Sequence, residues 1–349
     1  MRVTGERRTA RHHRIFHPSK RKRVCWGPRI SRAALLLATI LGCAVAAYAY
    51  LPMIDSSSGT PLKWANNAAT YQISTALGGS HFTSGQLAAI EATIQNAFAA
   101  WTSAPNTSVS ITWVGGTLPS PTIANDGHNV ICFNCSDAAF TDANGSSTDT
   151  LAITNISYQI SSQGTFLYDT DMLFNPAVHY VLPPNAGTAD GSTVSLQTVA
   201  THEAGHFLGL DHSAVQRAVM FPYISTLITT LSYDDVAAIS SLYPKATPDY
   251  ATGSLSGTIS LATDGSAVYG AHVYASSTTG NAVSGSFNIR QSPIGTLTKP
   301  DGTYAISGLP PDSYTVTAEP LDGPVQDSNI TWYDTSSRSV QTNFNTRWH

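Results

Sequence analysis

The residues best suited to chemistry are three histidines and a glutamate in the eleven-residue run HEAGHFLGLDH. If the segment Thr198–Leu208 is helical, His202 and His206 lie one turn apart on the same face, so both imidazoles can reach one ion. Gly209 has no Cβ and can adopt a positive φ, which would end the helix and return the chain so that His212 becomes a third ligand. Three neutral nitrogens leave a fourth position open for water, which is the arrangement of a catalytic zinc site.

Glu203 follows the first histidine and has the side chain that proton transfer at such a site requires. It would take a proton from the zinc-activated water as the water attacks a peptide carbonyl, and would then deliver a proton to the departing amine. A surface helix with solvated histidines, or an inactive relic, is the alternative, but a relic has no physical reason to keep this carboxylate. The motif therefore favours hydrolysis with one catalytic Zn²⁺ and Glu203 as the general base.

The same run carries a family resemblance. The pattern H-E-x-x-H-x-x-G-x-x-H, followed by Met220, resembles the metzincin clan of zinc endopeptidases. Ser213 directly after the third histidine, together with Met220-x-Pro222, is most similar to the matrixin branch. Five segments extend the resemblance, in order, over about residues 60 to 245: PLKWANNAATYQIS, IEATIQNAFAAWTS, YDTDMLFNP, SLQTVATHEAGH and LSYDDVAAISSLYP.

This resemblance implies a metzincin-type α/β (α+β) catalytic domain with a twisted, mostly parallel sheet and three helices. It implies a secreted zinc metalloendopeptidase that acts on protein or peptide substrates, with Met220 as an apolar floor beneath the rings and Pro222 as a pocket wall. Tyr223 departs from the family spacing of an oxyanion-stabilising tyrosine, so it is predicted to line the pocket or the core. The competing hypothesis is an exported binding or adhesion protein that uses an inactive metzincin scaffold.

Helices and strands must position these residues. Thr83-Ser84-Gly85-Gln86 predicts a capping box, after which apolar residues recur at helical spacing until Pro105. Ser195 is the predicted N-cap of the zinc helix, and Ser232-x-x-Asp235 predicts a last helix that ends before Pro244. Short β-prone runs are expected as strands at residues 109–114, 129–133, 151–156 and 166–174.

The first 49 residues are predicted to be a signal peptide. Eleven of the 18 lysines and arginines lie within residues 1–32, and an apolar run at 33–50 ends in Ala47-Tyr48-Ala49. The alternatives are an uncleaved membrane anchor with the catalytic domain outside, and lipidation at Cys43, which the continuing apolar run disfavours. The catalytic domain is expected to begin almost at the cleavage site, so no propeptide is expected.

The charge beyond Tyr50 excludes one class of partner. This part has 7 basic and 21 acidic residues, a net charge of −14 with histidine neutral. Such a surface repels phosphate, so nucleic acid is not an expected partner. A membrane is expected only if the leader stays uncleaved, and the sequence does not indicate an oligomeric state.

Cys132 and Cys135 are the two cysteines that follow the leader, and a local disulfide is the default prediction for an exported protein. No second Cys or His pair stands at a spacing that would make them a zinc site. His128 and His179 lack the His-x-Asp pattern by which matrix metalloproteinases hold a structural zinc, so a second zinc is not expected.

Acidic residues upstream of the motif receive weaker interpretations. A loop rich in oxygen ligands could hold Ca²⁺, but it lacks the spacing of a calcium loop, so a solvated turn is favoured and calcium stays open. This loop contains Asp137, Asp142, Asn144 and Asp149. Asp169 and Asp171 are expected to have a structural role.

Composition changes after Pro244. The expected organisation is a protease domain at 50–246, a linker at 247–253, a β-sandwich at 254–325 and a β-prone tail at 326–349, for which a further element cut short is the open alternative. Alternating apolar and polar residues between Asp-Gly turns predict strands within residues 256–275 and 299–320. This region resembles the carboxypeptidase regulatory-like, transthyretin-like module, although Ser313 replaces a usual glycine, and such modules are commonly accessory.

Overall fold

The computed structural model describes residues 51–55, 57–115, 123–188, 191–223, 228, 230–279, 292–330 and 339–348. The predicted leader at 1–49, with Cys43, lies outside the described residues. Within these ranges, no helix has the length and apolar character needed to cross a membrane. We call residues 51–244 the N-terminal region and residues 245–348 the C-terminal region.

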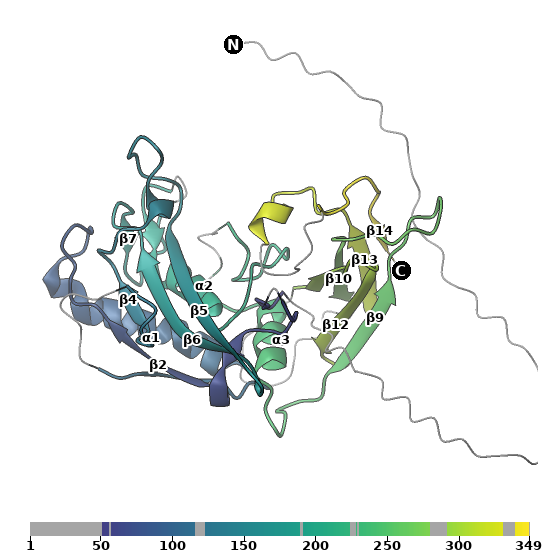
Figure 1. Ribbon diagram of the computed structural model, residues 1–349, viewed down its shortest axis with the longest axis horizontal. Helices are drawn as coiled ribbons and strands as arrows, with labels where there is room; N and C mark the ends of the chain where they lie inside the picture. Colours follow the sequence, from purple (N-terminus) through teal and green to yellow (C-terminus); the bar gives the residue numbers. More distant parts are fainter. Residues whose placement is uncertain are drawn as a thin grey trace, which may run out of the picture.

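A mostly parallel sheet forms one layer of the N-terminal region (Figure 1). Its strands run in the order β1-β6-β4-β2-β3, all parallel to their neighbours, and β5 pairs antiparallel with β6 along its length. The bounds are β1 Lys63–Trp64, β2 Ala68–Ile73, β3 Ser110–Trp113, β4 Val130–Cys132, β5 Ala152–Ser161 and β6 Gly164–Phe174. The sequence prediction ended β5 at residue 156, whereas the strand continues because it forms a hairpin with β6.

Two helices, α1 (Leu87–Thr102) and α2 (Leu196–Phe207), pack against each other on one side of this sheet. The predicted capping box of Thr83 and Gln86 is present and opens a 3₁₀ turn that leads into α1. Trp101 Nε1 of α1 donates to the carbonyl oxygen of Thr201 at 2.8 Å, which fixes α1 against the zinc-motif helix. Short elements complete this region: η1 Ala65–Asn67, η2 Ser84–Gln86, η3 Ala138–Phe140, β7 Tyr180–Val181 and β8 Val194–Ser195.

A third helix, α3 (Tyr233–Leu242), lies on the side of the N-terminal region that faces the C-terminal region (Figure 1). Ser232 is its N-cap and forms the capping box with Asp235, as the sequence predicted. Tyr243, which follows the helix, is fully buried and its hydroxyl donates to the carbonyl oxygen of Leu208 at 2.7 Å. The end of α3 is thereby tied to the end of α2.

The C-terminal region contains two antiparallel sheets. One has the order β11-β10-β13-β14 and the other pairs β12 with β9. The bounds are β9 Gly253–Thr258, β10 His272–Ser277, β11 Ile294–Leu297, β12 Thr303–Leu309, β13 Tyr314–Glu319, η4 Asp327–Asn329 and β14 Arg347–Trp348. Gly265 and Gly302, in the two predicted Asp-Gly turns, have φ of +75° and +76°.

The predicted tail needs correction. SVQTNF, expected to be strand-like, is irregular, whereas the strand in this tail is β14, which pairs with β13. The sequence TWYDTSS lies outside the described residues. The tail therefore belongs to the same sheet as the preceding strands.

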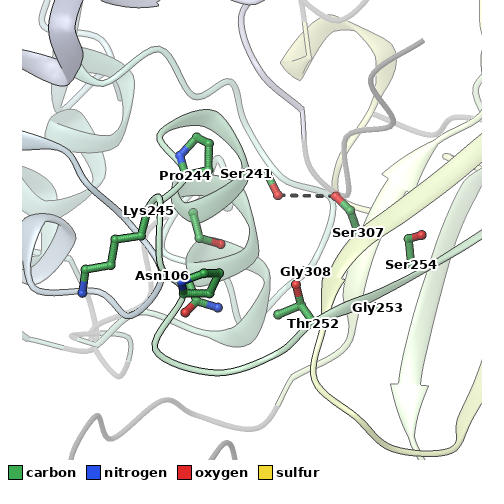
Figure 2. Close-up of a pocket in the computed structure, with 11 residues that line it drawn as sticks. Asn106, Ser241, Pro244, Lys245, Thr252, Gly253, Ser254, Ser307 and Gly308 are labelled. Atoms are coloured by element: carbon green, nitrogen blue, oxygen red, sulfur yellow. Dashed lines mark hydrogen bonds between the residues drawn. The ribbon is translucent and has the colours of Figure 1, made fainter. Parts of the chain in front are cut away.

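The predicted linker is held against the N-terminal region. The Asn106 side-chain oxygen accepts from the backbone N–H of Asp249 at 2.7 Å, and its amide donates to the carbonyl oxygen of Tyr250 at 3.1 Å. Figure 2 shows Asn106 beside a polar pocket between the end of α3 and strands β9 and β12. Across it, the Ser241 and Ser307 hydroxyls lie 3.4 Å apart. The chain between the regions is thus tied to the N-terminal region by hydrogen bonds, while most of its side chains stay exposed.

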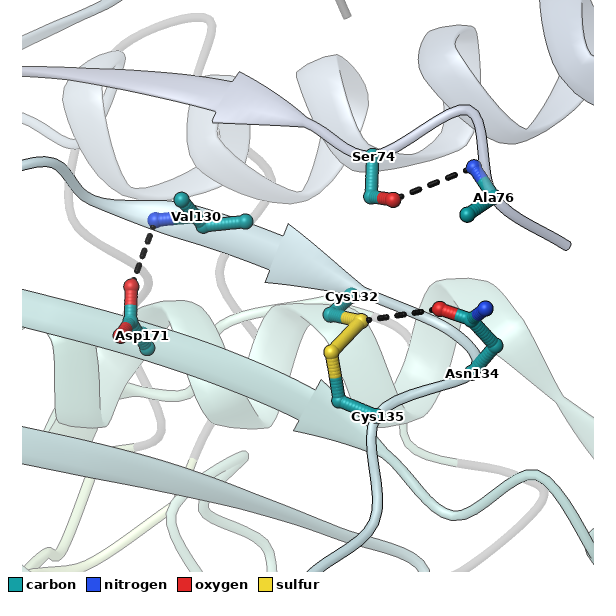
Figure 3. Close-up of a disulfide and its surroundings, with 7 residues drawn as sticks. All are labelled: Ser74, Ala76, Val130, Cys132, Asn134, Cys135 and Asp171. Atoms are coloured by element: carbon teal, nitrogen blue, oxygen red, sulfur yellow. Dashed lines mark hydrogen bonds between the residues drawn. A yellow bond between two sulfur atoms is a disulfide. The ribbon is translucent and has the colours of Figure 1, made fainter. Parts of the chain in front are cut away.

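The predicted disulfide between Cys132, the last residue of β4, and Cys135 is present (Figure 3). The two Cα atoms lie 5.7 Å apart, within the usual range for a bridge. Figure 3 also shows Asp171 of β6, whose Oδ1 accepts from the backbone N–H of Val130 at 2.8 Å. Asp169 accepts from the N–H groups of Asp126 and Gly127, so both acidic residues fasten the loop before β4.

Candidate metal centre and active site

The fold brings the three histidines of the motif together. One ligand atom from each of His202, His206 and His212 lies within 4.8 Å of the other two. His202 and His206 come from α2, and Gly209 turns the chain with φ of +90°. A Cβ at Gly209 would also lie 2.3 Å from the carbonyl oxygen of Leu62. Glycine is therefore required both by the conformation of this turn and by the close approach of the backbone.

Backbone carbonyls orient all three rings. Nδ1 of His202 lies 2.7 Å from the oxygen of Val219, and Nδ1 of His206 lies 2.8 Å from that of Leu210. Nδ1 of His212 lies 2.5 Å from the oxygen of Asn329. Since a carbonyl oxygen can only accept, each Nδ1 carries the proton and each Nε2 keeps its lone pair.

The charge state of the rings suits metal binding. Burial lowers the pKa of His202 to about 3, and the neighbouring His212 adds to the effect. Burial, followed by the two neighbouring histidines, holds the pKa of His206 well below its ordinary value, and burial also lowers the pKa of His212. The rings are therefore neutral at pH 7. Three neutral imidazoles with free Nε2 atoms form a donor set that fits zinc.

Glu203 is buried beside the cluster and has one defined partner. Thr154 Oγ1 of β5 donates to Glu203 Oε2 at 2.6 Å. Burial raises the pKa of Glu203 to about 7, and the Thr154 hydrogen bond opposes that rise. A carboxyl group with a pKa near the working pH is well matched to general acid–base chemistry.

Met220 lies directly beneath α2. A Cβ at Gly205, in the middle of the motif, would lie 2.2 Å from Met220 Sδ, so the helix and the methionine are in close contact. The Asp235 carboxylate accepts from the backbone N–H groups of Val219 and Met220 at 2.9 and 3.2 Å. Because Asp235 also caps α3, this helix fixes the turn that carries Met220.

The cluster opens into a cleft of about 730 Å³. Pro222 and Tyr223 line it, and Tyr223 is 53% exposed, so it lines the cleft rather than the core. The start of β5 also lines this cleft, as do two residues from the C-terminal region, Ser328 and Asn329.

His128 and His179 lie apart from this site, whereas the acidic loop reaches it at one residue, Asp149, which lines the cleft. His128 is exposed beside Asp126, and His179 is exposed and stacks on His81 with ring centroids 4.8 Å apart. Within the described ranges, the three-histidine cluster is the one group of three or more His, Cys, Asp or Glu residues placed to hold a metal. Asp142 accepts from the N–H groups of two residues in its own turn, Asn144 and Ser146. A solvated turn stays the prediction for this loop, with Ca²⁺ binding as the open alternative.

Two groups at this site, Thr154 and the Asn329 carbonyl, could not be predicted from the sequence. Thr154 gave no signal because it meets Glu203 only through the packing of β5 against α2. Asn329 acts through its backbone oxygen, which every residue possesses. The role of the Asn329 carbonyl is therefore set by the path of the chain and not by the residue type.

The family profile described as Matrixin matches residues 63–244. Karilysin from Tannerella forsythia is 39% identical over 82 residues, 21% of this chain and 17% of karilysin. Stromelysin-1 from Equus caballus is 47% identical over 68 residues, 18% of this chain and 14% of the relative. Macrophage metalloelastase from Oryctolagus cuniculus is 52% identical over 52 residues, 14% of this chain and 11% of the relative. The chain spans less than a fifth of the length of each of these relatives.

Proposed function

We propose, given that this chain belongs to the matrixin family, that it is a zinc-dependent endopeptidase that hydrolyses internal bonds of protein or peptide substrates. The observation that carries the proposal is the convergence of three neutral histidine nitrogens beside a buried glutamate in an open cleft. The family profile supports the same assignment. The alternative of an inactive scaffold for binding has no observation in its favour.

The three histidines are the proposed zinc ligands. A zinc ion held by His202, His206 and His212 would polarise the scissile carbonyl and lower the pKa of a water toward about 7. The carbonyl partners of the three Nδ1 atoms keep the rings in the tautomer that binds a metal through Nε2. Met220 supports the rings from below as an apolar floor.

Glu203 is the proposed proton carrier. Thr154 occupies Oε2, so we assign the proton transfer to Oε1 of the same carboxylate. Oε1 would take a proton from the attacking water and give it to the nitrogen of the departing amine. The raised pKa of Glu203 helps both steps, because the group can hold the proton between them.

Strand β5 is the proposed docking edge for the substrate backbone. Within the described residues β5 pairs only with β6, and residues 149–154 at its start line the cleft. An extended peptide can add to such an edge through main-chain hydrogen bonds, which places its scissile bond beside Glu203. Pro222 and Tyr223 would contact its side chains and so contribute to specificity.

Export completes the proposal. The basic and apolar leader at 1–49 has the pattern of a signal peptide, and a disulfide between Cys132 and Cys135 is typical of an oxidising compartment. The substrates would then be extracellular proteins or peptides.

The test compares the wild-type protein with Glu203→Ala in a chelator-sensitive peptide-library cleavage assay, together with metal analysis. We expect cleavage to fall by about 10²–10⁴-fold while the zinc content stays at one ion per chain. Glu91→Ala is the matched control, because Glu91 is on α1 outside the cleft. Wild-type protein that holds zinc but cleaves nothing would favour the scaffold hypothesis.

A further inference from the structure

The ring of the third histidine is oriented from the opposite end of the chain. Nδ1 of His212 donates to the carbonyl oxygen of Asn329, 117 residues further along the sequence. The rings of His202 and His206 donate instead to carbonyls within the N-terminal region. The contacts around the histidine cluster are therefore completed by the C-terminal region.

The segment that supplies this carbonyl is an ordered turn, η4. The backbone N–H of Gln326 donates to Asn329 Oδ1 at 2.9 Å, and the N–H of Asn329 donates back to the carbonyl oxygen of Gln326 at 2.9 Å. The N–H of Ile330 donates to the carbonyl oxygen of Asp327 at 3.1 Å. These bonds set the direction in which the Asn329 carbonyl points.

Apolar residues on both sides of η4 anchor it beside the cleft. Val325 and Ile330 are 3% and 6% exposed and belong to a buried cluster that reaches across both regions. Its other members are Leu51, Phe221, Leu297 and Leu321. Phe221 follows Met220 directly, so η4 is attached to the same turn that supports the zinc ligands. Moving η4 away from the cleft would expose this cluster to water.

A buried carboxylate braces the same junction. Asp234 of α3 accepts from the Ser213 hydroxyl at 2.6 Å and from the backbone N–H of Gly295 in β11 at 2.8 Å. Ser213 follows His212. The loop that carries the third ligand is therefore held to the C-terminal region at two places, directly through Asn329 and through Asp234.

We propose that two residues of η4 act in the active site, with the Asn329 carbonyl as the positioning group for His212 and Ser328 as a specificity-determining residue of the cleft wall. The specificity claim rests on the proposed function, whereas the positioning claim concerns only zinc binding. Groups that fix the tautomer of a metal-binding histidine typically contribute about 10–100-fold to metal affinity. The C-terminal region is then a component of the catalytic unit rather than an accessory module.

The first test measures zinc affinity of the full chain by competition with a chromogenic chelator. Asn329→Pro removes the N–H that bonds to Gln326 and forces a proline after a helical residue, so the turn opens and the carbonyl moves. We expect zinc affinity to fall about 10–100-fold. Asp327→Pro is the matched control, because it is the first residue of η4 and follows an extended residue, where proline is tolerated. It should bind zinc within about 2-fold of the wild type.

Asn329→Gly keeps the test valid if the proline variant does not fold. It retains the backbone N–H and removes the side chain whose oxygen accepts from the N–H of Gln326, so a smaller loss of zinc affinity in the same direction is expected. Unchanged zinc affinity in a folded Asn329→Pro or Asn329→Gly variant overturns the positioning role. Faster cleavage at unchanged zinc affinity also overturns it and would identify the contact as an obstruction.

The second test uses Ser328→Trp and the peptide library. A large side chain on the cleft wall should change which residues are accepted around the cleaved bond, while zinc affinity stays at the wild-type value. An unchanged cleavage profile overturns the specificity role. If the wild type binds zinc but cleaves no peptide, the proposed function fails, yet the zinc comparison still decides the role of Asn329.

Discussion

The two regions of this chain contribute to one site through different kinds of group. The N-terminal region contributes side chains, namely three imidazoles and a carboxylate from α2 and the loop after it. The C-terminal region contributes a backbone oxygen, that of Asn329, and the wall formed by η4. Side-chain chemistry is encoded by residue type, whereas backbone chemistry is encoded only by the path of the chain. A sequence motif can therefore predict the side chains of the N-terminal region but not the backbone oxygen of the C-terminal region.

Removing a proposed ligand side chain from the N-terminal region should produce the largest loss of zinc binding and cleavage. His206→Ala removes one of the three ligand nitrogens of the cluster, and the missing ring leaves a cavity beneath the cleft. We expect zinc content and chelator-sensitive cleavage both to fall to background, measured by metal analysis and the peptide assay. His179→Ala is the control, since His179 is exposed and outside the cluster. Retained zinc in the first variant would mean that His206 is not a ligand.

Two glycines allow the same backbone change to be made in each region. Gly209 and Gly265 have φ of +90° and +75°, but an added Cβ meets the Leu62 carbonyl at 2.3 Å in the first case and nothing within 4 Å in the second. In Gly265→Ala the only cost should come from holding alanine in a left-handed conformation, which lowers the unfolding free energy by about 1–2 kcal/mol. Gly209→Ala should cost more than this and weaken zinc binding, because the turn before His212 must move. Denaturant unfolding measures both costs, and equal values would contradict the steric argument.

The last predicted effect concerns the pH dependence of stability and Asp171, in the N-terminal region. Burial, with the nearby Asp169 and Asp126 charges, raises the pKa of Asp171 to about 7, above its value in the unfolded chain. The folded state therefore binds the proton more tightly, and this contribution to stability is present below about pH 4 and is lost as the pH rises to about 7.

Asp171→Asn keeps an acceptor for the Val130 N–H but removes the titration. Between pH 4.5 and 7.5, the unfolding free energy of the wild type should fall by roughly 2–3 kcal/mol more than that of the variant. Parallel stability curves for the two proteins would show that this carboxyl group does not titrate in the folded state within that window.

The sequence predicted those parts of the molecule that local chemistry decides. The Ser195 N-cap, the capping boxes at Thr83 and Ser232, and the turn at Gly209 are all set by residues within a few positions of one another. Strands β11 and β14 were missed because pairing with β10 and β13, rather than a clear local pattern, defines them. Thr154 and Asn329 were missed for a related reason: tertiary packing alone brings them to the site.

Helix α3 serves as core for both regions at once. Its Val236 and Ile239 belong to a continuous apolar cluster that includes Ile306 of β12, and Gly308 approaches Ala237 so closely that an added Cβ would lie 2.8 Å from the Ala237 Cβ. A chain that ends at residue 246 would expose an apolar face of this helix to water, so the shortened protein should self-associate. The whole polypeptide should instead melt in a single cooperative transition, with no separate step for either part.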